Sequence, residues 1–161
     1  MDSGGDKLVT SKTTRKRKCS RVFKIATYNV RSLSTEEKLL ELQEVLDKVN
    51  WDFIGMSEIR RQGEAWTTLK SGHILYHIDE TDNSIGGVGF LINKKHASDI
   101  LSIASVSKRV AYVIFRLNSR LKMKIIQAYA PTCTAEEDEI DQFYEDIDRA
   151  ITVPGCIHPF L

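Results

Sequence analysis

The sequence predicts an α/β domain that contains both parallel and antiparallel strand pairs. The first half shows a β-rich segment, a helix-like segment and a second apolar segment, an order typical of a parallel pair joined by a crossover helix. The second half shows short strand-like segments separated by turn residues, which is typical of hairpins. With 161 residues, of which 42% are hydrophobic, the chain can bury a core of its own.

The parallel pair is predicted at the start of the domain. Residues 22–30 are β-rich, and Ser34 followed by Glu37 forms a capping box for a helix over residues 35–49. Leucine and valine recur in this helix at helical spacing, which gives it one apolar face. Residues 52–57 are almost continuously apolar, as expected for a strand buried on both faces.

The remainder predicts antiparallel strands and a final helix. The predicted strands cover, in chain order, residues 73–79, 87–93, a weak 100–106, 110–117 and 122–129. Thr134 and Glu137 form a second capping box, which opens an amphipathic helix with Ile140, Phe143 and Tyr144 on one face.

Composition divides the chain into three parts. Residues 1–20 carry little apolar content and predict a disordered basic tail, residues 21–151 carry the domain, and residues 152–161 form a divergent C-terminal tail. The basic cluster of the first tail consists of Arg15, Lys16, Arg17 and Lys18. This cluster could be a nuclear-import signal, a non-specific phosphate contact, or a solvated segment that nothing recognises.

Charge, hydropathy and cysteine usage exclude several classes of protein. The net charge of +1 points to no class of partner, and no apolar run approaches the roughly 20 residues of a membrane helix. The three cysteines are widely separated and lack CxxC spacing, which argues against a disulfide framework and against a zinc site. We therefore expect a nuclear or cytosolic protein without membrane association.

Three polar side chains stand at the ends of predicted strands. Asn29 and Glu58 each close a strand of the parallel pair, and Tyr129 closes the last strand. Like ends of parallel strands meet at one edge of a sheet, where ligands of open α/β sheets usually bind. An amide, a carboxylate and a phenol gathered at one edge suit phosphodiester chemistry.

Four segments carry a resemblance to a known family. They are Ile-Ala-Thr-Tyr-Asn-Val-Arg-Ser-Leu at 25–33, Phe-Ile-Gly-Met-Ser-Glu-Ile-Arg at 53–60, Gly-Gly-Val-Gly-Phe-Leu-Ile at 86–92 and Ile-Gln-Ala-Tyr-Ala-Pro-Thr at 126–132. In order and spacing they resemble the endonuclease/exonuclease/phosphatase superfamily. The resemblance is greatest to the apurinic-type endonuclease domain of LINE-type (non-LTR) retrotransposons and the related craniofacial development protein 2 group.

The resemblance implies a fold and a set of roles. The fold would be the N-terminal portion of a two-sheet α/β sandwich, and the activity of full-length relatives would be nicking of DNA. Glu58 matches the acid that binds the catalytic Mg²⁺ or Mn²⁺, as a hard cation prefers carboxylate oxygen. Asn29 matches the amide that holds the metal-site network and the nucleophilic water, and Tyr129 matches the phenol that contacts the scissile phosphate.

Three arginines are candidate DNA contacts. Arg31 stands where the apurinic repair enzymes place an acid, and the resemblance makes it a candidate phosphate contact. Arg60 and Arg109 are candidates for contacts with the DNA backbone. For these two, the alternative is a solvated or intramolecular ion-pairing role.

Two family segments do not occur in this sequence. A Gly-Asp-Phe-Asn segment and a Ser-Asp-His segment, which the resemblance would place in a second half, are absent, so the resemblance implies a C-terminally truncated copy of the domain. We therefore expect weak or no activity of the chain alone, and an apolar sheet face left for self-association or for a protein partner. The alternatives are a non-enzymatic remnant or nucleic-acid-binding interaction protein, and a phosphatase acting on a small phosphorylated substrate.

Overall fold

The structure is a computed structural model that describes residues 22–80 and 86–154. The basic cluster at Arg15–Lys18 lies outside the described residues, as does most of the predicted C-terminal tail. The elements are, in chain order, β1 (Ile25–Asn29), α1 (Glu36–Leu46), β2 (Phe53–Ser57), β3 (Gly63–Thr68), β4 (Ile74–Asp79), β5 (Val88–Ile92), the 3₁₀ helix η1 (Lys94–Asp99), β6 (Ile100–Ser107), β7 (Val110–Arg116), β8 (Lys122–Ala128) and α2 (Glu137–Thr152).

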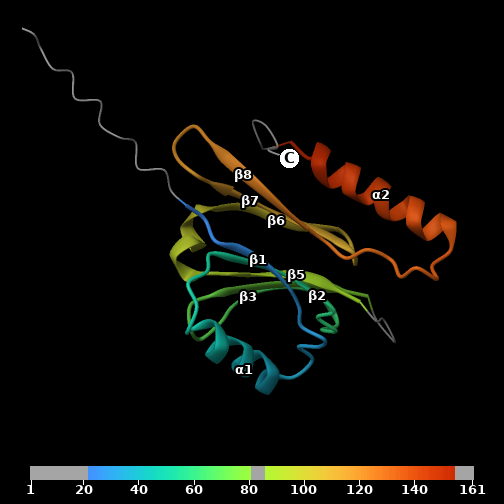
Figure 1. The fold of residues 1–161 in the computed structure, drawn as a ribbon. Helices are drawn as coiled ribbons and strands as arrows, with labels where there is room; N and C mark the ends of the chain where they lie inside the picture. The colour runs from blue at the N-terminus through green and yellow to red at the C-terminus, as the bar shows by residue number, and fades with distance from the viewer. Residues whose placement is uncertain (1–21, 81–85, 155–161) are drawn as a thin grey trace, which may run out of the picture.

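The strands form two sheets, and the predicted α/β sandwich is confirmed (Figure 1). One sheet has five strands in the order β1-β2-β5-β4-β3, and the other has three in the order β6-β7-β8. The predicted parallel pair is present, since β1 pairs with β2 in parallel and places Asn29 opposite Ser57. The other neighbours pair antiparallel. The short connections predicted this for β4 with β5, β6 with β7 and β7 with β8, whereas the pairings of β2 with β5 and of β3 with β4 were not predicted.

Apolar side chains fill the space between the two sheets and the space under each helix. The central cluster joins side chains such as Phe53 and Phe90 of the larger sheet to Val113 and Phe115 of the smaller sheet. The helix α1 covers the outer face of the larger sheet through Leu39. The helix α2 covers the outer face of the smaller sheet through Phe143 and Ala150. The layers are therefore helix, sheet, sheet and helix, as Figure 1 shows.

Several sequence-based boundaries and caps differ from the structure. Thr35, not Ser34, caps α1, because its hydroxyl accepts from the amide of Lys38, and the helix ends at Leu46, short of residue 49. Glu136, not Thr134, precedes α2, and its side chain makes no capping hydrogen bond. Helix α2 continues through Thr152.

The strand β3 and the helix η1 were not predicted. β3 reads Gly-Glu-Ala-Trp-Thr-Thr and lies at an edge, so it lacks the apolar alternation of a half-buried strand.

Tyr144 was expected on the apolar face of α2, but it is 61% exposed, because the buried face of the helix runs through Phe143, Asp146 and Ala150.

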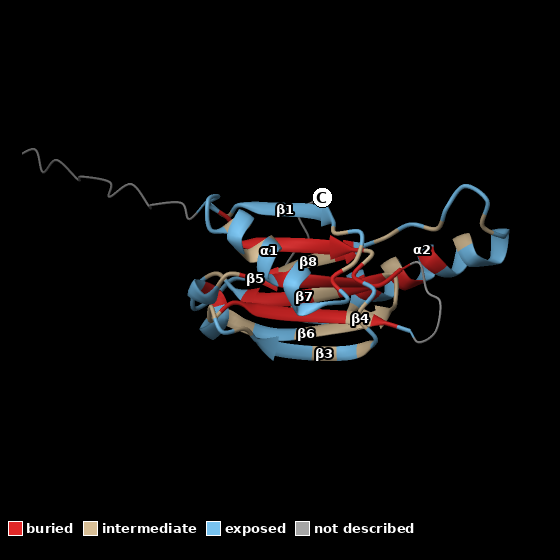
Figure 2. Ribbon diagram, turned by 90° about the horizontal axis from the view of Figure 1, so that it is seen from below, coloured by how far each residue is buried: buried red, intermediate tan, exposed pale blue. Residues whose placement is uncertain are grey.

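The sheet face that was expected to be uncovered packs against the other sheet, and both edge strands of the larger sheet, β1 and β3, are largely exposed. The inner faces of the two sheets pack against each other, whereas all five residues of β1 are exposed (Figure 2). Ile25 and Tyr28 are the large exposed apolar side chains of this strand. The strand β8 lies against β2 and β5.

Among the described residues, no helix is long and apolar enough to cross a membrane.

A buried carboxylate joins three segments at the start of the parallel pair. One oxygen of Asp52 lies 2.6 Å from Nε2 of His96 and 2.8 Å from Nζ of Lys95, and the other accepts from the Lys24 amide at 2.7 Å. Asp99 lies on the other side of the His96 ring, 3.9 Å from Nδ1. Burial alone would raise the pKa of Asp52, but these hydrogen bonds outweigh burial and lower it from 3.8 to about 2.

This arrangement predicts a pH-dependent contribution to stability. A carboxylate whose pKa is lower in the folded chain stabilises the fold above the unfolded pKa of 3.8, and this stabilisation is lost as the pH falls toward 2. Replacing Asp52 with Asn is expected to lower the free energy of unfolding at pH 7 by about 2 kcal/mol. Urea titrations of both proteins should show this difference shrinking below pH 4, whereas a difference independent of pH would contradict the assignment.

A lysine from the smaller sheet closes the C-terminal end of α2. Nζ of Lys124 donates to the carbonyls of Ala150, Ile151 and Val153 at 2.8, 2.9 and 2.8 Å. The last carbonyls of a helix lack partners within the helix and carry partial negative charge, so a cation there is favourable.

Replacing Lys124 with Met is expected to lower the free energy of unfolding by roughly 1.5–3 kcal/mol, because three carbonyls lose a charged donor. The control is Lys122→Met at the exposed start of β8, which is expected to stay within about 0.5 kcal/mol of the wild type. Thermal unfolding measures both. Equal losses of stability for Lys124→Met and Lys122→Met would show that the Lys124 hydrogen bonds to the helix end do not stabilise the fold.

Candidate active site

Asn29, Glu58 and Tyr129 come together at one end of the sandwich. Asn29 is the last residue of β1, Glu58 follows β2 directly, and Tyr129 follows β8 directly. The parallel pairing of β1 with β2 brings the first two side by side, as the sequence predicted. The packing of β8 against β2 brings the tyrosine across from the other sheet.

The three side chains form one hydrogen-bonded cluster centred on Glu58. Nδ2 of Asn29 donates to Oε1 of Glu58 at 2.6 Å, and the Tyr129 hydroxyl donates to the same oxygen at 2.9 Å. The other carboxylate oxygen, Oε2, accepts from Nη2 of Arg60 at 3.1 Å. The carboxylate is thus held from three sides, and its side chain keeps an exposed fraction of 15%.

The backbone at this end of the sheet adopts conformations that residues other than glycine rarely take. Among the described residues, the non-glycine positions with positive φ are Arg31, Ser32, Glu58 and Arg60, at 51°, 114°, 55° and 53°. All four follow β1 or β2. Such conformations cost of order 1–3 kcal/mol each and cluster at functional sites. Their concentration around Glu58 supports a functional role for this end of the sheet.

Hydrogen bonds set the protonation states of the cluster. Donation from Asn29 and Tyr129, together with the charge of Arg60, outweighs burial and holds the pKa of Glu58 below its ordinary value. Burial and the adjacent carboxylate raise the pKa of Tyr129. At neutral pH, Glu58 is therefore ionised and Tyr129 keeps its proton. The cluster offers a negative oxygen ligand beside a neutral hydrogen-bond donor.

Glu58 is the one residue of the cluster whose side chain could bind a hard divalent cation through a charged oxygen. A carboxylate oxygen has about two lone pairs, so Oε1 is filled by Asn29 and Tyr129, whereas Oε2 has one further position beside Arg60. Residues 22–80 and 86–154 contain no group of three or more His, Cys, Asp or Glu side chains that could hold a metal ion, and Glu58 is the single carboxylate of this cluster. Mg²⁺ and Mn²⁺ accept such sites, because they keep several waters and take one or two carboxylates plus phosphate oxygens.

The three candidate arginines have different surroundings. Arg31 is exposed, its amide donates to Oδ1 of Asn29 at 3.0 Å, and it lines a groove of about 470 Å³ between β1 and α1 together with Tyr28 and Lys38. Arg60 is 42% exposed and pairs with Glu58. Arg109 forms an ion pair with Glu139, at 2.6 Å.

Glu139 is a residue of this region that the sequence did not single out. It lies within the acidic run at the start of α2, which is typical of a solvated helix face, and its neighbours Glu136, Glu137 and Asp138 are indeed exposed. Its contact with Arg109 joins residues 30 positions apart. No local pattern indicates which acid of such a run makes the contact.

Comparison with known proteins finds similarity to a protein from two mammals. No family model matches the chain. The chain is 28% identical over 149 residues to Craniofacial development protein 2 of Bos taurus, covering 90% of this chain and 24% of that protein. It is likewise 28% identical over 148 residues to the protein of the same name from Tragulus javanicus, covering 89% of this chain and 25% of that protein. The chain is therefore similar to Craniofacial development protein 2 and spans about a quarter of the length of these relatives.

Proposed function

We propose that the chain carries part of a metal-dependent phosphodiesterase site that acts on DNA, of the endonuclease type found in LINE-type retrotransposons. The observation that carries the proposal is the cluster at Glu58, where side chains at the ends of three different strands meet, with the carboxylate ionised and the phenol protonated. The resemblance of the surrounding segments to the endonuclease/exonuclease/phosphatase superfamily gives the cluster its chemical interpretation.

Each member of the cluster has a distinct role in this proposal. Glu58 would hold Mg²⁺ or Mn²⁺ through Oε2, and Asn29 donates to the other oxygen and so fixes the carboxylate. Tyr129 shares Oε1 with Asn29, and its hydroxyl can turn to donate to a phosphate oxygen. Bound at Glu58, the cation would polarise the phosphoryl oxygen and stabilise the charge that develops on the leaving oxygen.

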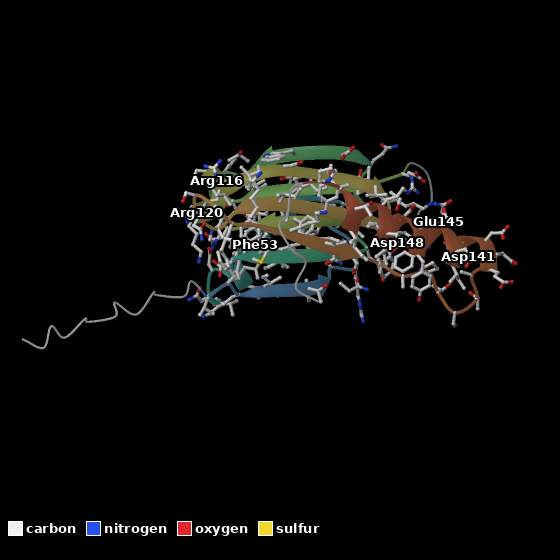
Figure 3. All side chains as sticks on the ribbon, turned by 90° about the horizontal axis from the view of Figure 1, so that it is seen from above. Phe53, Arg116, Arg120, Asp141, Glu145 and Asp148 are labelled. Atoms are coloured by element: carbon white, nitrogen blue, oxygen red, sulfur yellow. The ribbon has the colours of Figure 1, made fainter. Side chains whose placement is uncertain are left out.

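Contacts with the DNA backbone are assigned to exposed cations near the cluster. Arg31 is exposed beside Asn29, and Arg60 is 42% exposed while its Nη2 pairs with Glu58, so Arg31 and the remaining donors of Arg60 are the candidates for phosphate. The surface of α2 is unsuited to DNA, since Asp141, Glu145 and Asp148 are exposed along it; Figure 3 shows them at the opposite end of the molecule from Arg116 and Arg120. We therefore expect DNA binding to depend strongly on the divalent cation.

The proposal includes low activity of the isolated chain and a nuclear location. Removing one group that stabilises the transition state typically costs on the order of 10²-fold in rate, and the acid-base groups of the Gly-Asp-Phe-Asn and Ser-Asp-His segments do not occur in this sequence.

A nuclear location follows from DNA as the proposed substrate and from the basic segment at 15–18, which lies outside the described residues.

The test compares DNA binding with hydrolysis. A fluorescent duplex and a phosphomonoester are each incubated with the chain, with and without Mn²⁺, beside the variant Tyr129→Phe. The proposal predicts Mn²⁺-dependent binding of the duplex that Tyr129→Phe weakens, slow cleavage at most, and no phosphate from the monoester. DNA binding that is independent of Mn²⁺ and unchanged in Tyr129→Phe would favour a non-enzymatic interaction protein. Release of phosphate from the monoester would favour a phosphatase.

A further inference from the structure

Arg109 lies in the turn between β6 and β7 and contacts the segment that carries Tyr129. Its Nη1 donates to the carbonyl of Tyr129 at 3.3 Å and to the carbonyl of Ala130 at 3.4 Å. Its Nη2 donates to Glu139 at 2.6 Å. In the opposite direction, the Tyr129 amide donates to the carbonyl of Arg109 at 2.9 Å. One arginine therefore joins three segments that are distant in the sequence.

The same guanidinium also restrains the tyrosine ring. Its central carbon lies 5.8 Å from the centroid of the Tyr129 ring, a distance at which a cation and an aromatic face attract. Tyr129 directly follows β8, and the bond from its amide to the Arg109 carbonyl holds its backbone. The Arg109 guanidinium adds contacts to the ring and to the Tyr129 carbonyl, while the hydroxyl bonds to Glu58 at 2.9 Å.

Glu139 in turn fixes the direction of the guanidinium. It lies in the first turn of α2, where a carboxylate is favoured by the helix dipole, and it binds Nη2 while Nη1 faces the Tyr129 carbonyl. A guanidinium is planar and presents its donors in a fixed fork, so binding at one end orients the other. The Arg109 side chain is 22% exposed and the Glu139 side chain 46% exposed, so the arginine is partly shielded from solvent and its carboxylate partner is not.

We propose that Arg109 is a positioning residue for Tyr129 and that Glu139 holds Arg109 in place, so that the start of α2 supports the candidate active site. The role of Tyr129 in phosphate binding is taken from the proposed function, on which this inference rests. The contacts of Arg109 with Tyr129 and Glu139 do not depend on the proposed function. It differs from the sequence-based hypothesis that Arg109 contacts the DNA backbone, because the donors of Arg109 are directed at protein carbonyls and at Glu139.

The two roles of Arg109 predict opposite effects of neutralising Glu139. If Arg109 contacted phosphate, Glu139→Gln would release the guanidinium and strengthen DNA binding, and Arg109→Gln would reduce the slope of log affinity against log salt by about one. If Arg109 positions Tyr129, Glu139→Gln and Arg109→Gln weaken Mn²⁺-dependent DNA binding together and leave the salt slope unchanged. Opposite effects of these two variants would overturn the proposal.

A second measurement needs neither metal nor DNA. The aromatic resonances of ¹³C-labelled tyrosine are recorded, and the signal of Tyr129 among the five tyrosines is assigned from its loss in Tyr129→Phe. We expect Arg109→Gln and Glu139→Gln each to shift the Tyr129 signal. The double variant should shift the signal no further than Arg109→Gln alone. The signal of Arg109→Lys should lie between those of the wild type and Arg109→Gln. The matched control Glu137→Gln changes an exposed acid of the same helical turn and should leave the signal in place.

The two measurements separate failure of this inference from failure of the proposed function. Circular dichroism first confirms that each variant is folded. An unchanged Tyr129 signal in folded Arg109→Gln, or an equal shift in Glu137→Gln, would overturn the positioning role whatever the protein does with DNA. A shifted Tyr129 signal in a protein that binds neither Mn²⁺ nor DNA would leave the positioning role intact and would overturn the proposed function.

Discussion

Replacing Phe53 with Ala is expected to lower the free energy of unfolding by about 3–5 kcal/mol, among the largest effects that one substitution can have in this fold. Phe53 is fully buried in β2, between the two sheets. Its ring stacks on Phe115 of the smaller sheet at 4.3 Å and on His96 at 5.1 Å, and it lies 6.3 Å from Phe23. Truncation leaves a cavity at the point where the sheets meet, and the strands on both sides cannot close it without moving apart.

Denaturant titration measures this effect, and two variants calibrate it. Phe53→Leu keeps most of the buried volume and is expected to cost far less than the alanine variant. Val45→Ala removes an exposed apolar side chain of α1, which is 60% accessible, and should stay within about 0.5 kcal/mol of the wild type. A loss for Phe53→Ala no larger than that for Val45→Ala would contradict the assignment of the central core.

Glu58→Gln is expected to reduce affinity for Mn²⁺ by at least the roughly 10- to 100-fold that loss of a residue supporting a metal ligand typically costs. The amide keeps the size of the side chain but removes the negative charge. It also leaves Asn29 and Tyr129, which both donate to Oε1, without a charged acceptor. Isothermal titration with Mn²⁺ measures the affinity directly and does not depend on catalysis.

The matched control for this prediction is Glu44→Gln, which neutralises an exposed acid on α1. If the loss of affinity came from a general reduction of negative charge, the two variants would lose affinity equally. The account requires a large loss for Glu58→Gln only. Equal affinity of wild type and Glu58→Gln would mean that the cluster is not the metal site.

The fold could be predicted from the sequence where burial imposes a pattern. The apolar run at 52–57 and the helical spacing of leucines before it specified β2, α1 and the parallel pairing of β1 with β2. The edge strand β3 was missed, because an exposed edge needs no apolar alternation. The caps were misplaced, because several Ser, Thr and Glu residues precede each helix and only the backbone geometry selects among them.

In the candidate site, too, the sequence predicted some contacts and missed others. The meeting of Asn29 with Glu58 could be predicted, because the ends of parallel strands coincide. The distance of Tyr129 from Glu58 depends on how the two sheets pack, which no local pattern encodes. The same holds for Glu139 with Arg109, for Lys124 with the end of α2, and for the positive φ of Arg31 and Glu58. Such contacts and conformations depend on tertiary packing.

The central claim is that the cluster at Glu58 binds a divalent cation, and mapping the paramagnetic effect of Mn²⁺ on the NMR spectrum of the wild-type chain tests it most directly. The account predicts that Mn²⁺ at low occupancy broadens first the signals of the Asn29 side-chain amide, the Glu58 backbone amide and the Tyr129 ring. Broadening centred instead on the acidic start of α2, at Glu136–Asp141, or broadening without any centre, would contradict it.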